Sequence, residues 1–234
     1  MLDLRSDVDN LWRASTRLSS AKGGRALMFM SVQSGVGTSS VATSFALITA
    51  EKSRKTSWLV DLDFSNNSLI DAFDAGFVDD AGRPGRPYDA SLGQVPFFDV
   101  SVPGQRKLTA NVSSGKLLAA HQIQQTRLLV TRFRNERLAY GQQVRLSSRS
   151  AWWNALRKSA DWIIVDAPAY EQSREGLNIV SNMDGVVLVV HGDQTDIESL
   201  TIAKEEVQAA GGHVLGVVMN QMRGDALFAD RLAG

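Results

Sequence analysis

Five short apolar runs alternate with amphipathic stretches along the chain. The runs cover residues 26–32, 57–62, 162–165, 186–191 and 214–219. Their length and their content of Val, Ile, Leu, Met and Phe indicate strands buried on both faces. Residues 39–52, 150–159, 171–180 and 195–210 carry apolar side chains at three- and four-residue spacing, which predicts helices. The alternation of strand and helix predicts an α/β fold with a single doubly wound parallel sheet.

The alternation breaks between residues 76 and 106, which contain four of the five prolines. We expect a long loop there, with one short strand near residues 97–102. We interpret residues 1–234 as one domain. Within it we expect an N-terminal helix and linker over residues 1–24, an irregular basic insertion over residues 76–149, and a short C-terminal helix over residues 224–232.

Charge is balanced overall and uneven along the chain. The 25 Lys and Arg equal the 25 Asp and Glu, which argues against a protein that binds nucleic acid by its total charge. Residues 83–149 nevertheless hold 11 basic and three acidic residues, about +8, and the remainder is about −8. Four arginines fall within residues 127–137. This segment is either a solvated face or a docking surface for an acidic partner, lipid headgroups or an anionic polymer.

Other classes of protein are excluded by composition. The chain has no cysteine, so disulfide scaffolds, thiolate metal sites and cysteine nucleophiles are excluded. No apolar run approaches the roughly 18 residues that cross a bilayer, and the first residues do not resemble a signal peptide. We therefore expect a cytoplasmic protein.

The first predicted strand runs directly into a glycine-containing loop, Ser31-Val-Gln-Ser-Gly-Val-Gly-Thr-Ser-Ser40, and then into a helix. This order allows backbone N–H groups at a helix N-terminus to bind a phosphate. Gly35 and Gly37 permit a tight turn, and the hydroxyl groups that follow can cap the helix or bind magnesium. The predicted phosphate-binding residues are Ser34, Gly35, Val36, Gly37, Thr38, Ser39 and Ser40.

The loop lacks the lysine of a Walker A motif, because Thr38 follows Gly37 where that lysine belongs. A charge-assisted hydrogen bond contributes about 1.5–3 kcal/mol, so triphosphate binding should be weakened roughly tenfold to a hundredfold. Phosphoryl transfer should be weakened more, because negative charge grows in the transition state.

Three aspartates follow predicted strands. Asp61 and Asp63 end the second strand, and Asp166 ends the third. Ligands of open parallel sheets bind at this edge, so the three carboxylates could order a magnesium ion and its waters beside Ser39. Each aspartate taken alone could instead cap a helix.

With these motifs the chain resembles the deviant-Walker P-loop proteins, most closely the bacterial tyrosine kinase (BY-kinase) domain of capsule and exopolysaccharide assembly. MinD and ParA ATPases are more distant members. The counterparts of Walker A, A′ and B are residues 31–40, 59–63 and 163–168. The resemblance spans nearly the whole chain. It implies a P-loop NTPase-like fold and a place near the adenine base for Asn220.

The departures from the family concern its cations and its tyrosines. Thr38 replaces the Walker lysine, Gln33 replaces the signature lysine of MinD and ParA, and Ser65 replaces an arginine of the kinases. The only tyrosines are Tyr88, Tyr140 and Tyr170, so no autokinase substrate is evident. The ring-assembly motif of the kinases is not matched near the N-terminus, which leaves the oligomeric state open.

The resemblance and its departures imply a non-catalytic or weakly active BY-kinase-like regulatory or scaffold protein of exopolysaccharide or capsule synthesis and export. It would dock on a membrane polysaccharide co-polymerase or chain-length regulator, at the inner face of the cytoplasmic membrane. ATP or ADP with magnesium would bind weakly or not at all. If the protein is active, it is a weak ATPase that uses Asp61, Asp63 and Asp166, with the lysine replaced by Lys22 or Arg223.

Two other classes of function fit parts of the pattern. A MinD- or ParA-like positioning ATPase has the same fold, although Gln33 argues against it. An NAD-binding oxidoreductase would use Gly35, Gly37 and Asp61, but Ser40 stands where its third glycine belongs and Asp166 would have no function. No nucleic-acid partner is expected, because the basic segment has no interleaved aromatic residues.

Overall fold

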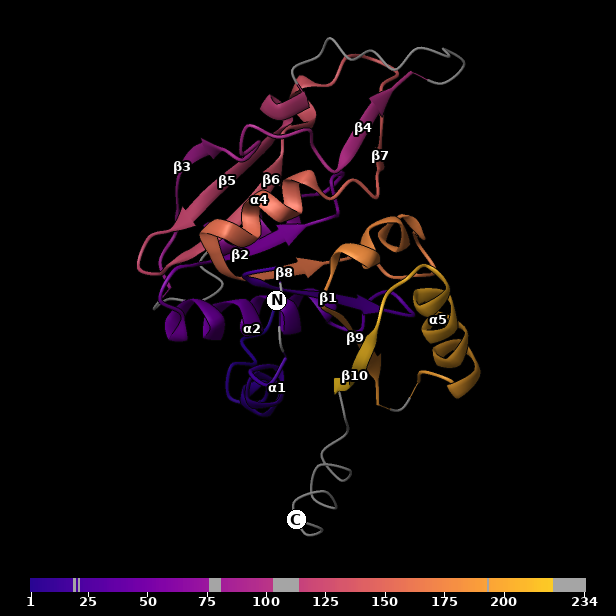
Figure 1. Ribbon diagram of the computed structural model, residues 1–234. Helices are drawn as coiled ribbons and strands as arrows, with labels where there is room; N and C mark the ends of the chain where they lie inside the picture. The colour runs from indigo at the N-terminus through magenta and orange to yellow at the C-terminus, as the bar shows by residue number, and fades with distance from the viewer. Residues whose placement is uncertain (19, 21, 76–80, 103–113, 193, 221–234) are drawn as a thin grey trace.

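The computed structural model describes residues 1–18, 20, 22–75, 81–102, 114–192 and 194–220. A central sheet has eight strands in the order β10-β9-β1-β8-β2-β6-β5-β3 (Figure 1). Its first six strands in that order are mutually parallel, and β5 and β3 continue it in antiparallel pairing. The strand bounds are β1 Arg25–Ser31, β2 Thr56–Asp61, β3 Pro84–Asp89, β5 Leu118–Ile123, β6 Leu128–Phe133, β8 Ala160–Asp166, β9 Gly185–His191 and β10 Val214–Asn220. The predicted α/β fold is confirmed.

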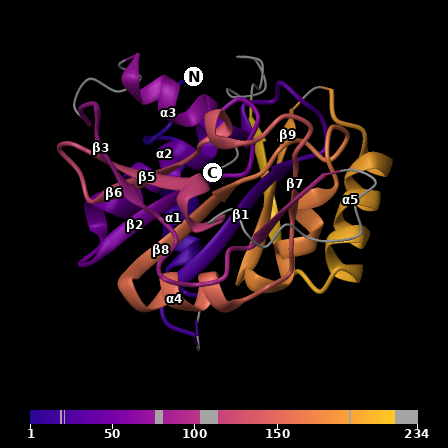
Figure 2. The same ribbon diagram turned by 90° about the horizontal axis from the view of Figure 1, so that it is seen from above.

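Helices cover both faces of this sheet. The α-helices are α1 Asp9–Ser15, α2 Thr38–Lys52, α3 Ser68–Asp74, α4 Ala151–Ser159 and α5 Ile197–Ala209, and the 3₁₀ turns are η1 Ser114–Leu117, η2 Asn135–Arg137 and η3 Glu175–Asn182. Figure 2 shows α3 on one side of the sheet and α4 on the other. Along β1, Leu27 and Phe29 pack into the α2 layer, whereas Met28 and Met30 pack into the α4 layer. Successive side chains of β1 point to opposite faces of the sheet, and both faces are covered by helices. The strand is therefore apolar throughout.

The prediction of an irregular insertion is wrong for much of residues 76–149. The segment contributes β3, β5 and β6 to the main sheet, and β4 Phe98–Ser101 pairs with β7 Gln143–Leu146 as a separate antiparallel ribbon. Only β4, near residues 97–102, was expected. A hairpin signal is present in β5 and β6, which bury apolar residues on either side of a short turn. The β3 strand gives a weak signal, because it contains two prolines and lies at the sheet edge.

The helix predictions need two further corrections. Residues 171–180 were expected to form an α-helix, but the described element is the 3₁₀ segment η3, which begins at Glu175. The seven-residue helix α3 was not predicted, because it is too short to establish a clear period. The remaining predicted strands and helices are confirmed, and residues 224–232 lie outside the described part of the chain.

Candidate functional site

The glycine-containing loop connects β1 to α2 in the predicted order. Gly35 and Gly37 have φ angles of 78° and 83°, in the left-handed region that glycine adopts without strain. Gly37 immediately precedes α2. The first N–H groups of that helix have no partner within the helix, so the loop presents backbone donors to an anion.

A cavity of about 310 Å³ lies beside these donors. Five of the predicted phosphate-binding residues line it: Ser34, Gly35, Gly37, Thr38 and Ser39. The opposite wall comes from the segments after β2 and β8 and includes Asp63, Asp166 and Gln172. The structure therefore brings together the glycine loop and two of the three predicted aspartates at the carboxyl edge of the sheet.

Three predicted nucleotide-binding residues do not line this cavity. Val36 is only 4% exposed and packs in the core beneath α2. The Ser40 hydroxyl accepts a hydrogen bond from the Leu2 N–H at 3.1 Å. The Asn220 amide donates to the Val36 carbonyl oxygen at 2.8 Å. Ser40 therefore contacts the N-terminal segment and Asn220 contacts the loop, and nucleotide binding by these three residues stays a prediction.

The segment after β8 holds the loop from the other side. The Glu171 carboxylate accepts hydrogen bonds from the Ser34 N–H at 2.7 Å and from its hydroxyl at 2.8 Å. The backbone of the same segment also contacts the end of β1 and the loop. The Tyr170 N–H donates to the Ser31 carbonyl at 2.8 Å, and the Glu171 N–H donates to the Val32 carbonyl at 3.1 Å. Contacts to the Ser34 N–H and hydroxyl lower the pKa of Glu171. Glu171 lies in a segment predicted to be helical and matches no binding motif, so its contact with the loop was not expected.

Asp61 and Asp166 are neighbours at the ends of adjacent strands. They face each other in the register of β2 and β8, and both are nearly buried. Asp61 Oδ1 accepts the Asp63 N–H at 2.8 Å, whereas Asp61 Oδ2 and Asp166 Oδ1 have no hydrogen-bond partner among the described residues. Burial, reinforced by the Asp166 charge, raises the pKa of Asp61 well above its usual range. Burial also raises the pKa of Asp166 to about 7, although the Ser39 hydroxyl opposes this.

The residues of the cavity fit a magnesium-bound phosphate in their chemistry. Magnesium takes one or two protein oxygens and fills its other positions with phosphate and water. Ser39, Asp63 and Asp166 line the cavity, and their side-chain oxygens are of the kind that accept hydrogen bonds from metal-bound water. Within the described ranges no three carboxylate or imidazole groups gather into a preformed metal cage. Asp61 does not line the cavity. A magnesium site formed by Asp61 together with Ser39, Asp63 and Asp166 therefore stays a prediction.

No positively charged side chain was found in the described wall of this cavity, which carries two carboxylates. Thr38 lines the wall at the position of the missing lysine. The prediction that Lys22 could take the place of the missing Walker lysine is wrong, because Lys22 lies too far from the cavity. Lys22 precedes β1, and that seven-residue strand puts roughly 20 Å between its two ends. Arg223 lies outside the described residues.

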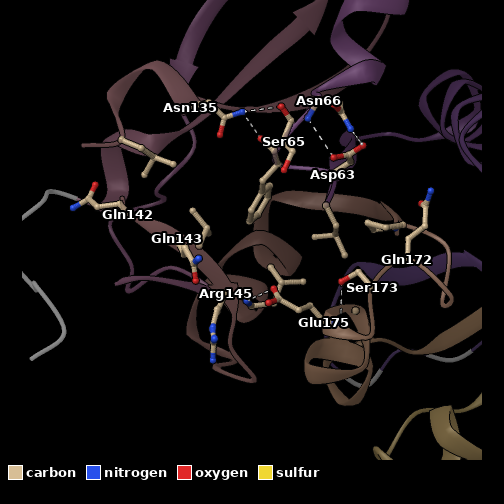
Figure 3. A pocket seen from close by; sticks show the side chains of 17 residues that line it. Asp63, Ser65, Asn66, Asn135, Gln142, Gln143, Arg145, Gln172, Ser173 and Glu175 are labelled. Carbon is tan, nitrogen blue, oxygen red and sulfur yellow. Dashed lines mark hydrogen bonds between the residues drawn. The ribbon is translucent and has the colours of Figure 1, made fainter. Parts of the chain in front are cut away.

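A second cavity, of about 820 Å³, adjoins the first. The two share Asp63, Pro168 and Gln172 in their walls. Figure 3 shows its polar side chains around the space, with Asn135, Ser65 and Asn66 on one side and Gln143, Ser173 and Glu175 on the other. The β7 strand and the η2 turn form much of this wall, so the cavity depends on the inserted segment, which was predicted to be irregular.

Comparison with known proteins agrees with this geometry. The chain is 27% identical over 203 residues to the tyrosine-protein kinase CpsD of Streptococcus agalactiae, which covers 87% of this chain and 78% of that protein. The crystal structure of the VpsO kinase domain matches with a TM-score of 0.58 and 14% identity, over 94% of this chain and 96% of that one. The MinC:MinD cell division complex of Aquifex aeolicus matches with a TM-score of 0.51 and 16% identity, over 88% and 72%. No family model matches the sequence.

A search of the described helices found none that is long and apolar enough to cross a membrane. The structural matches support the fold. The similarity in sequence to CpsD and the order of strand, glycine loop and helix point to the bacterial tyrosine kinases among the proteins that share this fold. The chain is similar in sequence to a bacterial tyrosine kinase and has the fold of BY-kinase domains and of MinD-type P-loop proteins.

Proposed function

We propose that the protein is a regulatory scaffold of exopolysaccharide or capsule synthesis that binds nucleotide at the glycine loop and has little or no phosphoryl-transfer activity. The observation that carries the proposal is a supported phosphate loop beside a cavity whose described wall has carboxylates and no cation. Contacts from Glu171 and Asn220 support the loop before any ligand arrives. Preorganised donors favour binding, whereas transfer of a phosphoryl group needs positive charge where negative charge develops.

Direct titration tests the binding half of this proposal. We expect the purified protein to bind Mg-ADP by calorimetry and to release no phosphate from Mg-ATP above background. Replacing Gly37 by Val should abolish binding, because a β-branched residue does not adopt φ of 83° without strain. Gly141→Val is a matched control, since Gly141 also has a positive φ of 77° but lies outside the 310 Å³ cavity. Equal affinity in the Gly37 variant, or multiple turnover by the wild-type protein, would contradict the proposal.

The partner in this proposal is a membrane polysaccharide co-polymerase or chain-length regulator, and the docking surface is part of the basic segment. The arginines of residues 127–137 do not form one group. Arg127 donates to the Ser53 carbonyl at one end of β6. At the other end Arg134 and Arg137 both donate to the Lys116 carbonyl, at 3.2 and 3.3 Å. Arg132 pairs with Glu136 at 2.9 Å. We therefore propose the η1 and η2 end of the hairpin as the docking surface, and the gathering of Arg134 and Arg137 beside Lys116 supports this choice.

Charge reversal tests that surface. We expect Arg134→Glu with Arg137→Glu to abolish recovery of the co-polymerase with the tagged protein from detergent-solubilised membranes, because a basic surface that recognises acidic groups loses its complementarity. Arg83→Glu with Arg86→Glu is the matched control, since these exposed arginines belong to the same basic segment. Undiminished recovery with the first pair would remove this surface from the proposal.

A further inference from the structure

The space beyond the phosphate loop has, in its described wall, no cationic side chain of the kind that a γ-phosphate site of the Walker type provides. A ligand held by the amides at the start of α2 extends into a wall that contains Asp63 and Gln172. Phosphate oxygens at neutral pH only accept hydrogen bonds, and a carboxylate also only accepts. A third phosphate would lie beside Asp63 and would depend on bound magnesium alone to offset that charge, because the described wall of this cavity holds no cationic side chain. A neutral group rich in hydroxyls would instead donate to the same carboxylate.

The adjoining 820 Å³ cavity has the lining that such a neutral group needs. Five amide side chains line it: Asn66, Asn135, Gln142, Gln143 and Gln172. The amide groups of Gln143 and Gln172 make no hydrogen bond within the described part of the chain, so both their donors and their acceptors remain available. Amides offer both donors and acceptors, which match hydroxyl groups.

The remaining walls of this cavity combine apolar side chains with hydroxyl groups and with the charged side chains of Asp63, Arg145 and Glu175. Phe64 stacks on Phe133 with 4.5 Å between ring centroids, and Leu138 lines the cavity from the far side of η2. Asn135 donates to the carbonyls of Phe64 and Ser65, which ties the inserted segment to the end of β2. Sites for small molecules combine apolar surface with convergent polar groups, and this cavity has both. The cavity volume exceeds what a single hexose needs.

We propose that the two cavities form one binding site for a nucleoside diphosphate sugar, with the diphosphate on the glycine loop and the sugar in the amide-lined cavity. The proposal rests on nucleotide binding at the loop, as proposed above. The two walls meet at Asp63 and Gln172, where the sugar would join the diphosphate. The missing lysine then has a chemical explanation, because a sugar occupies the place of the γ-phosphate.

The test compares the affinities of three ligands with the same base, which are ADP, ADP-glucose and ATP. Each is titrated with magnesium into the full chain. UDP and UDP-glucose form a second pair for the same comparison. We expect the sugar nucleotide to bind about tenfold more tightly than the diphosphate, as one or two added hydrogen bonds provide. ATP should bind more weakly than ADP. Binding of ADP with no gain from glucose in either pair would overturn this inference and leave nucleotide binding intact. Failure of every nucleotide to bind would overturn both proposals.

A pair of variants localises the sugar. Gln143→Ala with Gln172→Ala should remove most of the advantage of the sugar nucleotide over the diphosphate, measured as the ratio of their two affinities. Gln94→Ala with Gln208→Ala is the matched control, because both glutamines are exposed and line neither cavity. An unchanged ratio in the first pair would contradict the placement of the sugar. Equal thermal unfolding temperatures would exclude a general loss of stability.

Discussion

Replacing Arg157 by Ala is expected to lower the free energy of unfolding by about 3–5 kcal/mol, because the change leaves a buried network with unpaired groups. Arg157 is 2% exposed and belongs to α4. Its guanidinium donates to Asp184 at 2.6 Å, to the Asn182 carbonyl at 2.7 Å, and to Gly24 and Ser20. Asp184 also accepts the Ala26 N–H at 2.7 Å, so the network holds the start of the strand that leads into the phosphate loop.

The measurement is chemical unfolding of the wild-type protein and the variant, followed by circular dichroism. Arg54→Ala is the control, because Arg54 is exposed and its loss should change the free energy of unfolding by no more than about 0.5 kcal/mol. The double variant Arg157→Ala with Asp184→Ala should lose less than the sum of the two single variants, because the two groups interact directly. Additive losses would show that the ion pair contributes little.

Replacing Thr38 by Lys is expected to raise the affinity for Mg-ATP by roughly tenfold to a hundredfold, the reverse of the loss assigned to the missing charge-assisted hydrogen bond. Thr38 lines the cavity at the first position of α2, facing a wall that contains Asp63 and Asp166. A lysine there would add the positive charge that the described wall lacks. The gain should be larger for ATP than for ADP, because the Walker lysine contacts the β- and γ-phosphates.

Thr38→Met separates charge from size, since methionine has a long unbranched side chain and no charge. We expect that variant to bind ATP no better than the wild-type protein in the same calorimetric titration. A similar gain with methionine would attribute the effect to packing. If the lysine variant also releases phosphate from ATP, the wild-type protein lacks activity because of this one position, and the remaining residues of the site suffice for turnover.

Much of the architecture follows from local pattern. The six parallel strands include all five predicted apolar runs, because strands buried on both faces must be apolar throughout. The sixth parallel strand, β6, was not predicted, because the basic residues of its segment dominated the interpretation. Its apolar residues Leu128, Val130 and Phe133 are nevertheless buried. The glycine positions predicted the turn into α2, since a positive φ is a local property of the backbone.

The composition of the site could be predicted from the sequence only in part. Asp63 and Asp166 could be placed beside the loop, because parallel strands end at the same edge of a sheet. Ser40 and Asn220 were placed with them by their motifs, and the structure adds contacts that the motifs did not indicate, from Ser40 to the N-terminal segment and from Asn220 to the loop. Glu171 carries no motif at all. Its contact with Ser34 joins residues 137 positions apart, which no local spacing could reveal.

The sequence by itself determined the strand and helix alternation, the glycine turn and the absence of a lysine after Gly37, because these are properties of neighbouring residues. Only the tertiary structure decided what surrounds the loop. The pairing of β7 with β4 and the position of η2 place glutamines and asparagines from the inserted segment against the end of β2, where they enclose the larger cavity. Such a cavity is a product of long-range packing, so the pattern along the chain carries no record of it.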